Sequence, residues 1–137
     1  SLKDMYKKLA EYPSKRITVF IDACFSGGAR NQGLVAARGV RIEPRNPFPN
    51  GKIIVFTASS GNQSSLPFKS KQHGLFTYYL LKKLKETNAN IDYKSLSDYI
   101  KEKVGIKSVM INNKEQNPTL IISPNINKEW REYKLSN

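Results

Sequence analysis

Along the chain, segments with apolar residues at helical spacing alternate with nearly unbroken apolar runs. Apolar residues recur at helical spacing in three segments, and a fourth, shorter segment follows near the end. Helices are predicted over residues 2–12, 75–86, 93–104 and 127–134. Two nearly unbroken runs of β-branched and aromatic residues, 17–21 and 52–58, are typical of strands covered on both faces. A shorter run at 119–122 predicts a third strand, and Pro118 indicates that it is a strand start or a sheet edge.

This alternation of helices with buried strands indicates an α/β fold, in which helices cover a mostly parallel sheet. Three strands are fewer than a sheet usually has, so residues 1–137 are predicted to be one portion of a single domain. Residues 27–51 hold five glycines and three prolines and are predicted to form a long flexible loop. Residues 124–137 are expected to be a C-terminal extension of the domain.

The composition narrows the class of protein. The chain has 137 residues, of which 39% are hydrophobic, enough for a core, and no apolar run approaches the ~20 residues of a membrane span. We therefore expect no membrane partner. A single Cys excludes an internal disulfide framework and a multi-Cys zinc site, and we expect no metal and no cofactor.

The positive charge is unevenly distributed. The formal net charge is +12, and residues 30–85 alone carry ten Lys or Arg against one acid. Such a stretch suits nucleic acid, an acidic protein face or a solvated surface. Because the basic residues are sparse and have no interleaved aromatics, a solvated surface is favoured, and nucleic acid is not the expected partner.

The single Cys directly follows the first predicted strand, at the end of the sheet where ligands bind in open α/β folds. Asp22 stands two residues before Cys24, and small residues follow it at 26–28. A buried, inert thiol is the alternative, since free Cys is among the most buried residues. A core Cys needs neither a carboxylate nor a sharp turn beside it, so the pattern favours a nucleophile.

Three motifs in the same order resemble one family. They are residues 22–27 (DACFSG) after the first strand, 57–65 (TASSGNQSS) after the second, and 73–81 (HGLFTYYLL) at a helix start. Together they resemble the caspase-like cysteine peptidases of the metacaspase and bacterial kind. From residue 1 to about 123 the spacing of the elements agrees with the second half of that fold.

The resemblance implies a caspase-like three-layer α/β/α sandwich, of which this chain is the C-terminal part. It implies peptide hydrolysis with Cys24 as the nucleophile and Asp22 in the S1 pocket, where Asp22 pairs with a P1 Arg or Lys. True caspases carry Gln-Ala-Cys at this place and select Asp, so Asp22 favours a basic P1. Ser59 and Ser60 are expected beside the same pocket. The alternatives are a carboxylate satisfied by nearby backbone N–H groups and two ordinary turn serines.

The base that such a peptidase needs is not where the family has it. In caspase-like enzymes the His lies roughly 50 residues before the Cys, but no His precedes Cys24. His73 lies after the Cys, in a motif where the family has a helix start, and is not expected to be the base. We therefore expect two partners. One is an N-terminal, His-bearing portion of the same protein, and the other is a peptide or protein substrate with a basic P1 residue.

The long loop suggests self-processing. An enzyme that cuts after Arg or Lys is expected to cut its own loop beside the nucleophile. The candidate positions are Arg30, Arg38, Arg41 and Arg45.

Two other functions fit parts of the sequence. Cys24 and Arg30 satisfy the Cys-x5-Arg spacing of a phosphatase, whose loop cradles phosphate with backbone N–H groups and an Arg. Ala23 and Asn31 depart from that pattern, and a Gly- and Pro-rich loop follows where a helix should begin. The non-enzyme alternative is an inactive, basic caspase-like scaffold that binds other molecules.

Overall fold

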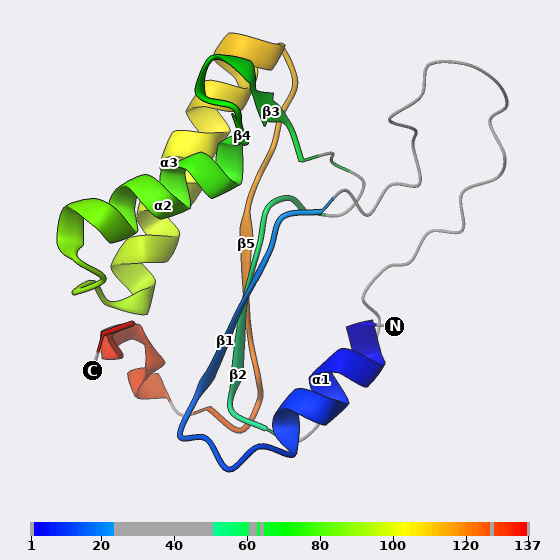
Figure 1. The fold of residues 1–137 in the computed structure, drawn as a ribbon, viewed down its shortest axis with the longest axis vertical. Helices are drawn as coiled ribbons and strands as arrows, with labels where there is room; N and C mark the ends of the chain where they lie inside the picture. The colour runs from blue at the N-terminus through cyan, green and yellow to red at the C-terminus, as the bar shows by residue number, and fades with distance from the viewer. Residues whose placement is uncertain (1, 24–50, 61–62, 64, 127, 137) are drawn as a thin grey trace, which may run out of the picture.

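The computed structural model describes residues 2–23, 51–60, 63, 65–126 and 128–136 (Figure 1). Its main sheet has three strands, β1 (Ile17–Ile21), β2 (Ile53–Thr57) and β5 (Thr119–Ile122), in the order β1-β2-β5. β1 and β2 are parallel, and β5 is antiparallel to β2. The three predicted strands are therefore present, and β2 is one residue shorter at each end than expected.

The two long strands differ in burial. All five residues of β2 are buried, as its unbroken apolar run predicts for a strand covered on both faces. All five residues of β1 are only half-buried, although its sequence has the same character. The reason is position, since β2 has a neighbour on each side and β1 lies at an edge of the described sheet.

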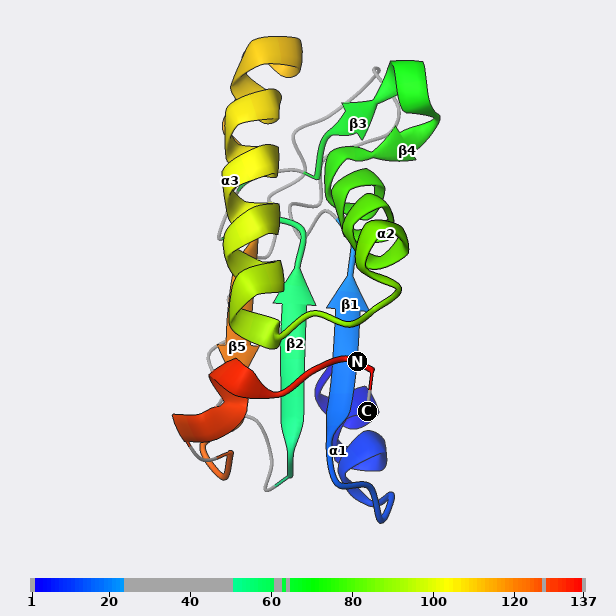
Figure 2. The ribbon, with the colours of Figure 1, turned by 90° about the vertical axis from the view of Figure 1, so that its left-hand side faces the viewer.

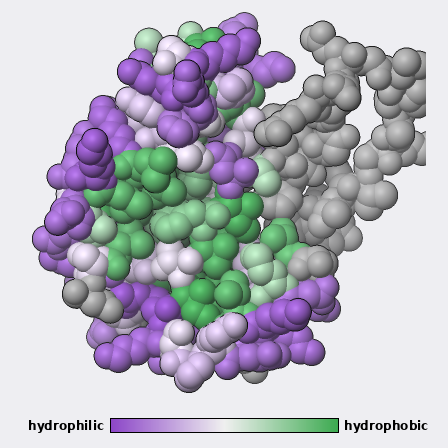
Figure 3. Space-filling model, viewed as in Figure 1, coloured by the Kyte–Doolittle hydropathy of each residue, from purple (hydrophilic) through white to green (hydrophobic). Residues whose placement is uncertain are grey.

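Helices lie on both faces of the sheet. α2 (Leu75–Thr87) and α3 (Tyr93–Asn112) pack against each other and cover one face, while α1 (Leu2–Ala10) lies on the opposite side (Figures 1 and 2). Figure 3 shows hydrophobic surface on the face between α2 and α1. The chain thus has the α/β fold that its pattern predicts and the α/β/α layering that the family resemblance implies.

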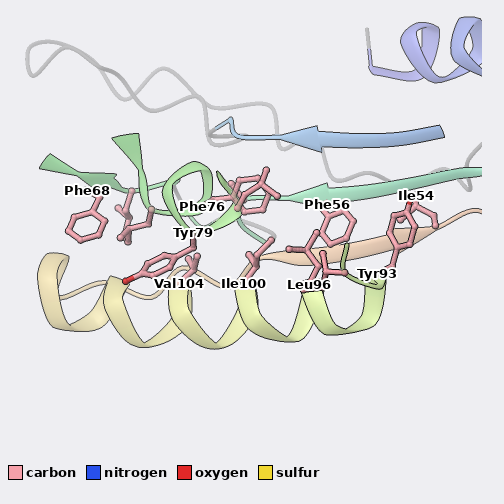
Figure 4. Packing of buried hydrophobic residues seen from close by; sticks show 14 residues of the cluster. Ile54, Phe56, Phe68, Phe76, Tyr79, Tyr93, Leu96, Ile100 and Val104 are labelled. Atoms are coloured by element: carbon pink, nitrogen blue, oxygen red, sulfur yellow. The ribbon is translucent and has the colours of Figure 1, made fainter. Parts of the chain in front are cut away.

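The core lies between β2 and the α2–α3 pair. Its largest fully buried side chains include those of Phe56, Phe76, Tyr93, Leu96 and Ile100 (Figure 4). By contrast, α1 has no buried residue. At roughly 1.5–3 kcal/mol for each large apolar side chain, this cluster supplies most of the hydrophobic stabilisation.

α3 is eight residues longer than expected. Asp92 begins it as an N-cap, accepting a 2.7 Å hydrogen bond from the Ser95 N–H, and Asn113 in the left-handed conformation ends it. The expected end at Val104 is wrong because the buried side continues to Ser108. Within the described residues, no helix is both long and apolar enough to span a bilayer.

Short elements lie before α2 and near the C-terminus. A hairpin of β3 (Pro67–Phe68) and β4 (His73–Gly74), joined by the 3₁₀ turn η1 (Lys69–Lys71), precedes α2. Near the C-terminus the predicted short helix is a 3₁₀ helix, η2 (Lys128–Glu132).

The last residues pack back onto the domain. The Tyr93 N–H donates to the Tyr133 carbonyl at 2.9 Å, and the Leu135 N–H donates to the Ile91 carbonyl at 3.2 Å. The Arg16 guanidinium lies 5.3 Å from the ring centroid of Tyr93 and 4.5 Å from that of Tyr133. The C-terminal segment is therefore fixed to the start of β1 and of α3.

Candidate active site

The carboxyl ends of β1 and β2 meet at one edge of the sheet, because the two strands are parallel and in register. The Ala58 N–H donates to the Ile21 carbonyl at 2.9 Å, which keeps the two strand ends together. Asp22 and Ala23 follow β1 directly. Both strands point toward the β3–β4 hairpin (Figure 2).

Several predicted site residues lie outside the described residues. These are Cys24, residues 27–50 of the predicted loop 27–51, and the four candidate cleavage positions in it, Arg30, Arg38, Arg41 and Arg45. Their predicted roles stay predictions. The structure does describe Asp22, which precedes Cys24, and Ser59 and Ser60, which follow the next strand.

The Asp22 carboxylate is exposed and held by two hydroxyl groups. The Ser65 hydroxyl donates to Oδ1, and the Thr77 hydroxyl donates to Oδ2 at 2.5 Å. Gly74 lies against the same carboxylate, since a Cβ at this residue would come within 2.7 Å of Oδ2. Among the described residues, Asp22 forms no ion pair. An ionised carboxylate held this way keeps lone pairs for a cationic ligand.

Ser59 and Ser60 lie at the end of β2, where the sequence places them. The Ser59 hydroxyl is buried and donates to the Gln63 carbonyl at 3.0 Å. The Ser60 hydroxyl donates to Gln63 Oε1 at 3.2 Å, and the same oxygen accepts from the Asn117 N–H at 2.7 Å. In the described structure both hydroxyls therefore fix the turn after β2.

A buried amide connects this turn to the hairpin. Gln116 is fully buried, and its Oε1 accepts from the Leu66 N–H at 2.8 Å while its Nε2 donates to the Ala58 carbonyl at 2.7 Å. Its backbone N–H donates to the Ser108 hydroxyl at 3.1 Å. Because Leu66 follows Ser65, the Gln116 side chain holds the backbone next to the residue whose hydroxyl donates to Asp22.

His73 lies in β4, opposite Phe68, and is exposed. Gly74, the next residue, is the N-cap of α2. The structure thus places His73 beside the start of α2, the place that its motif indicates. Among the described residues, no group of three or more His, Cys, Asp or Glu side chains is close enough to hold a metal ion.

Sequence reasoning did not assign a role to Ser65, Thr77 or Gln116. The signal for the first two was present, because Ser65 ends the serine-rich motif and Thr77 lies in the helix-start motif. The structure brings both motifs onto Asp22. Gln116 has no signal beyond a polar residue shortly before a strand.

Comparison with known proteins shows the family and the fold of the chain. A family model described as the caspase domain matches residues 1–128. The search of curated proteins finds no match. Among solved structures, the chain is similar to the crystal structure of caspase-1 from Spodoptera frugiperda, with a TM-score of 0.50 and 17% identity.

The structural match covers 75% of this chain and 42% of the insect caspase-1 chain, so this chain spans less than half the length of that protein. At this level of identity the likeness shows the fold. The family model, in contrast, covers nearly the whole sequence. The chain therefore belongs to the caspase domain family, a family of cysteine peptidases.

Proposed function

We propose that this chain is the Cys-bearing portion of a cysteine endopeptidase that cleaves peptide bonds after Arg or Lys. The observation that carries the proposal is the exposed Asp22 carboxylate, two residues before Cys24 in the sequence. Within the described structure, this carboxylate accepts hydrogen bonds from hydroxyl groups only. Such a carboxylate recognises a guanidinium or ammonium group by charge-assisted hydrogen bonds. Membership of the caspase domain family favours this reaction over a phosphatase built on Cys24 and Arg30.

The proposed chemistry is acyl transfer through the Cys24 thiolate. A His base takes the thiol proton, the thiolate sulfur attacks the carbonyl carbon, and the backbone N–H of Cys24 helps to hold the oxyanion. Collapse of the intermediate breaks the C–N bond, and the His returns the proton to the departing amine. Water then hydrolyses the thioester, which releases the acid and restores the thiol.

Asp22 is the proposed P1 anchor. It directly follows β1 and stands two residues before Cys24 in the sequence, which supports this role. Ser59 and Ser60, at the end of the neighbouring strand, are proposed to line the same pocket through the turn that their hydroxyls fix.

The base is proposed to come from an N-terminal, His-bearing portion of the same protein. Two observations support this partner. β1 is half-buried at an edge of the described sheet, and hydrophobic surface extends over that face (Figure 3). The chain also spans only 42% of the caspase-1 chain that it resembles. A further strand of that portion beside β1 would cover this edge, and the portion would supply the His that forms a Cys-His dyad with Cys24.

Self-processing after Arg30, Arg38, Arg41 or Arg45 is a separate part of the proposal. Mass spectrometry of the active full-length protein is expected to find a new terminus after one of these arginines, absent from the Cys24→Ala variant. Fully active protein with an intact loop would refute it.

The test of the function is cleavage of matched peptides that differ only at P1. Full-length protein is expected to cleave the Arg and Lys peptides and not the Asp peptide. Cys24→Ala is expected to abolish cleavage, and Asp22→Ala to remove the preference for the basic residues. Cleavage after Asp, or activity that survives Cys24→Ala, would contradict the proposal.

A further inference from the structure

We propose that Ser65 and Thr77 are positioning residues that hold the Asp22 carboxylate in the orientation that binds a basic P1 side chain. The inference deepens the proposed function and rests on it. It concerns residues that lie 43 and 55 positions from Asp22 in the sequence and reach one carboxylate in the fold.

Each of the two hydroxyls binds a different oxygen of the Asp22 carboxylate. Ser65 donates to Oδ1 and Thr77 to Oδ2, so rotation of the carboxylate about its Cβ–Cγ bond would break both hydrogen bonds together. Because Asp22 is exposed, an unheld side chain would sample several rotamers. A held carboxylate binds a cation without the cost of ordering it, which is the usual gain from preorganisation.

Both donors stand on fixed supports. Thr77 lies in the first turn of α2, directly after the buried Leu75 and Phe76, which anchor that turn in the core. Ser65 precedes Leu66, whose N–H is bonded to the buried Gln116 amide at 2.8 Å. The positions of the hydroxyls are therefore set by the core and not by the exposed surface.

The choice of hydroxyls also suits a cation site. A carboxylate offers about four lone-pair positions, and two hydroxyl donors leave about two of them for a substrate. Hydroxyls add no positive charge, so the attraction of Asp22 for a cation is kept. A Lys or Arg in their place would neutralise it, and in a chain with a net charge of +12 this attraction is needed to bind a basic substrate.

Because Gly74 has no side chain, it leaves room for the Asp22 carboxylate. A Cβ there would lie 2.7 Å from Oδ2, closer than side chains normally approach. The backbone of Gly74 has φ −68° and ψ 152°, which any residue can adopt. A Cβ at this position would therefore displace the Asp22 carboxylate, although the backbone conformation would accept another residue.

The test measures cleavage by the full-length protein of two peptides that differ only at P1, one with Arg and one with its uncharged isostere citrulline. Thr77→Val and Ser65→Ala are each expected to raise KM for the Arg peptide about tenfold with kcat little changed, since each removes one hydrogen bond to a charged group. Thr77→Ser keeps the hydroxyl and is expected to keep the wild-type KM for the Arg peptide. Thr87→Val is the matched control, because its hydroxyl donates to the Lys83 carbonyl on the same helix, away from Asp22.

A double-mutant cycle separates positioning from a general structural role. In an Asp22→Asn background, Thr77→Val is expected to change KM by less than about twofold, because there is no charge left to position. An equal tenfold effect in both backgrounds would overturn the inference. So would a preference for Arg over citrulline that Asp22→Asn removes but Thr77→Val and Ser65→Ala leave intact. If the wild-type protein shows no preference for Arg over citrulline, the proposed function itself fails.

Discussion

Replacement of Gln116 by Leu tests how the hairpin and the end of β2 are held together. The change leaves the Leu66 N–H and the Ala58 carbonyl without their partners, and both groups are buried. An unsatisfied buried group costs about 1–3 kcal/mol, so the two cost about 4 kcal/mol. The apolar replacement returns about 1–2 kcal/mol through burial, which leaves a net loss of about 2–3 kcal/mol.

The assay is urea unfolding of the full-length protein followed by circular dichroism. With a slope of about 1–3 kcal/mol per molar urea, the loss moves the midpoint down by about 0.7–3 M. Asn112→Ala is the matched control, because Asn112 donates a single exposed hydrogen bond to the Pro67 carbonyl of the same hairpin. It is expected to cost less than about 1 kcal/mol. If Gln116→Leu costs no more than this control, the reasoning about the two buried backbone groups is wrong.

Three further predictions concern other parts of the fold. Burial alone would raise the pKa of Asp92, but the hydrogen bonds from Ser95 outweigh it and lower this pKa below its ordinary value. The cap is therefore stabilising at neutral pH and is lost as pH falls through the lowered pKa. We expect Asp92→Ala to cost about 1 kcal/mol at pH 7 and progressively less as pH falls through the lowered pKa, whereas a pH-independent difference in urea midpoints would contradict this. Arg16→Lys loses the guanidinium that donates to the Tyr93 hydroxyl at 3.2 Å and lies 4.5 Å from the ring centroid of Tyr133. It should lower stability by about 1 kcal/mol, and an unchanged thermal midpoint would count against these contacts. Gly74→Ala should raise KM for an Arg peptide with the urea midpoint nearly unchanged, and wild-type KM would show that the contact with Asp22 is unimportant.

The main helices show an apolar repeat and the main strands an unbroken apolar run, so each carries a local pattern that predicts it. The strands of the β3–β4 hairpin have two residues each and show none. α3 continues beyond its expected end, where Gly105 and the exposed apolar residues Ile106 and Met110 blur the amphipathic pattern. Local spacing also does not show that β1 lies at an edge of the described sheet, since this depends on which strands are its neighbours.

The candidate site was accessible from the sequence only in part. The strand before Asp22 predicts its place at the edge of the sheet, and the structure has it there. Its partners Ser65 and Thr77 come from two other segments, and the hydrogen bonds that join them to Asp22 depend on the packing of α2. Gln116 bonds to Leu66 across 50 residues, a distance at which no local pattern operates.

The central claim joins a nucleophilic Cys24 to a carboxylate that selects a basic P1 residue. Full-length protein treated with equal concentrations of two peptidyl chloromethyl ketones, one with Arg and one with Asp at P1, tests both parts in a single peptide-mapping measurement. The account predicts that the Arg reagent alkylates Cys24 much faster than the Asp reagent, and that Asp22→Asn removes the difference. Alkylation at another residue, or faster alkylation by the Asp reagent, would contradict the account.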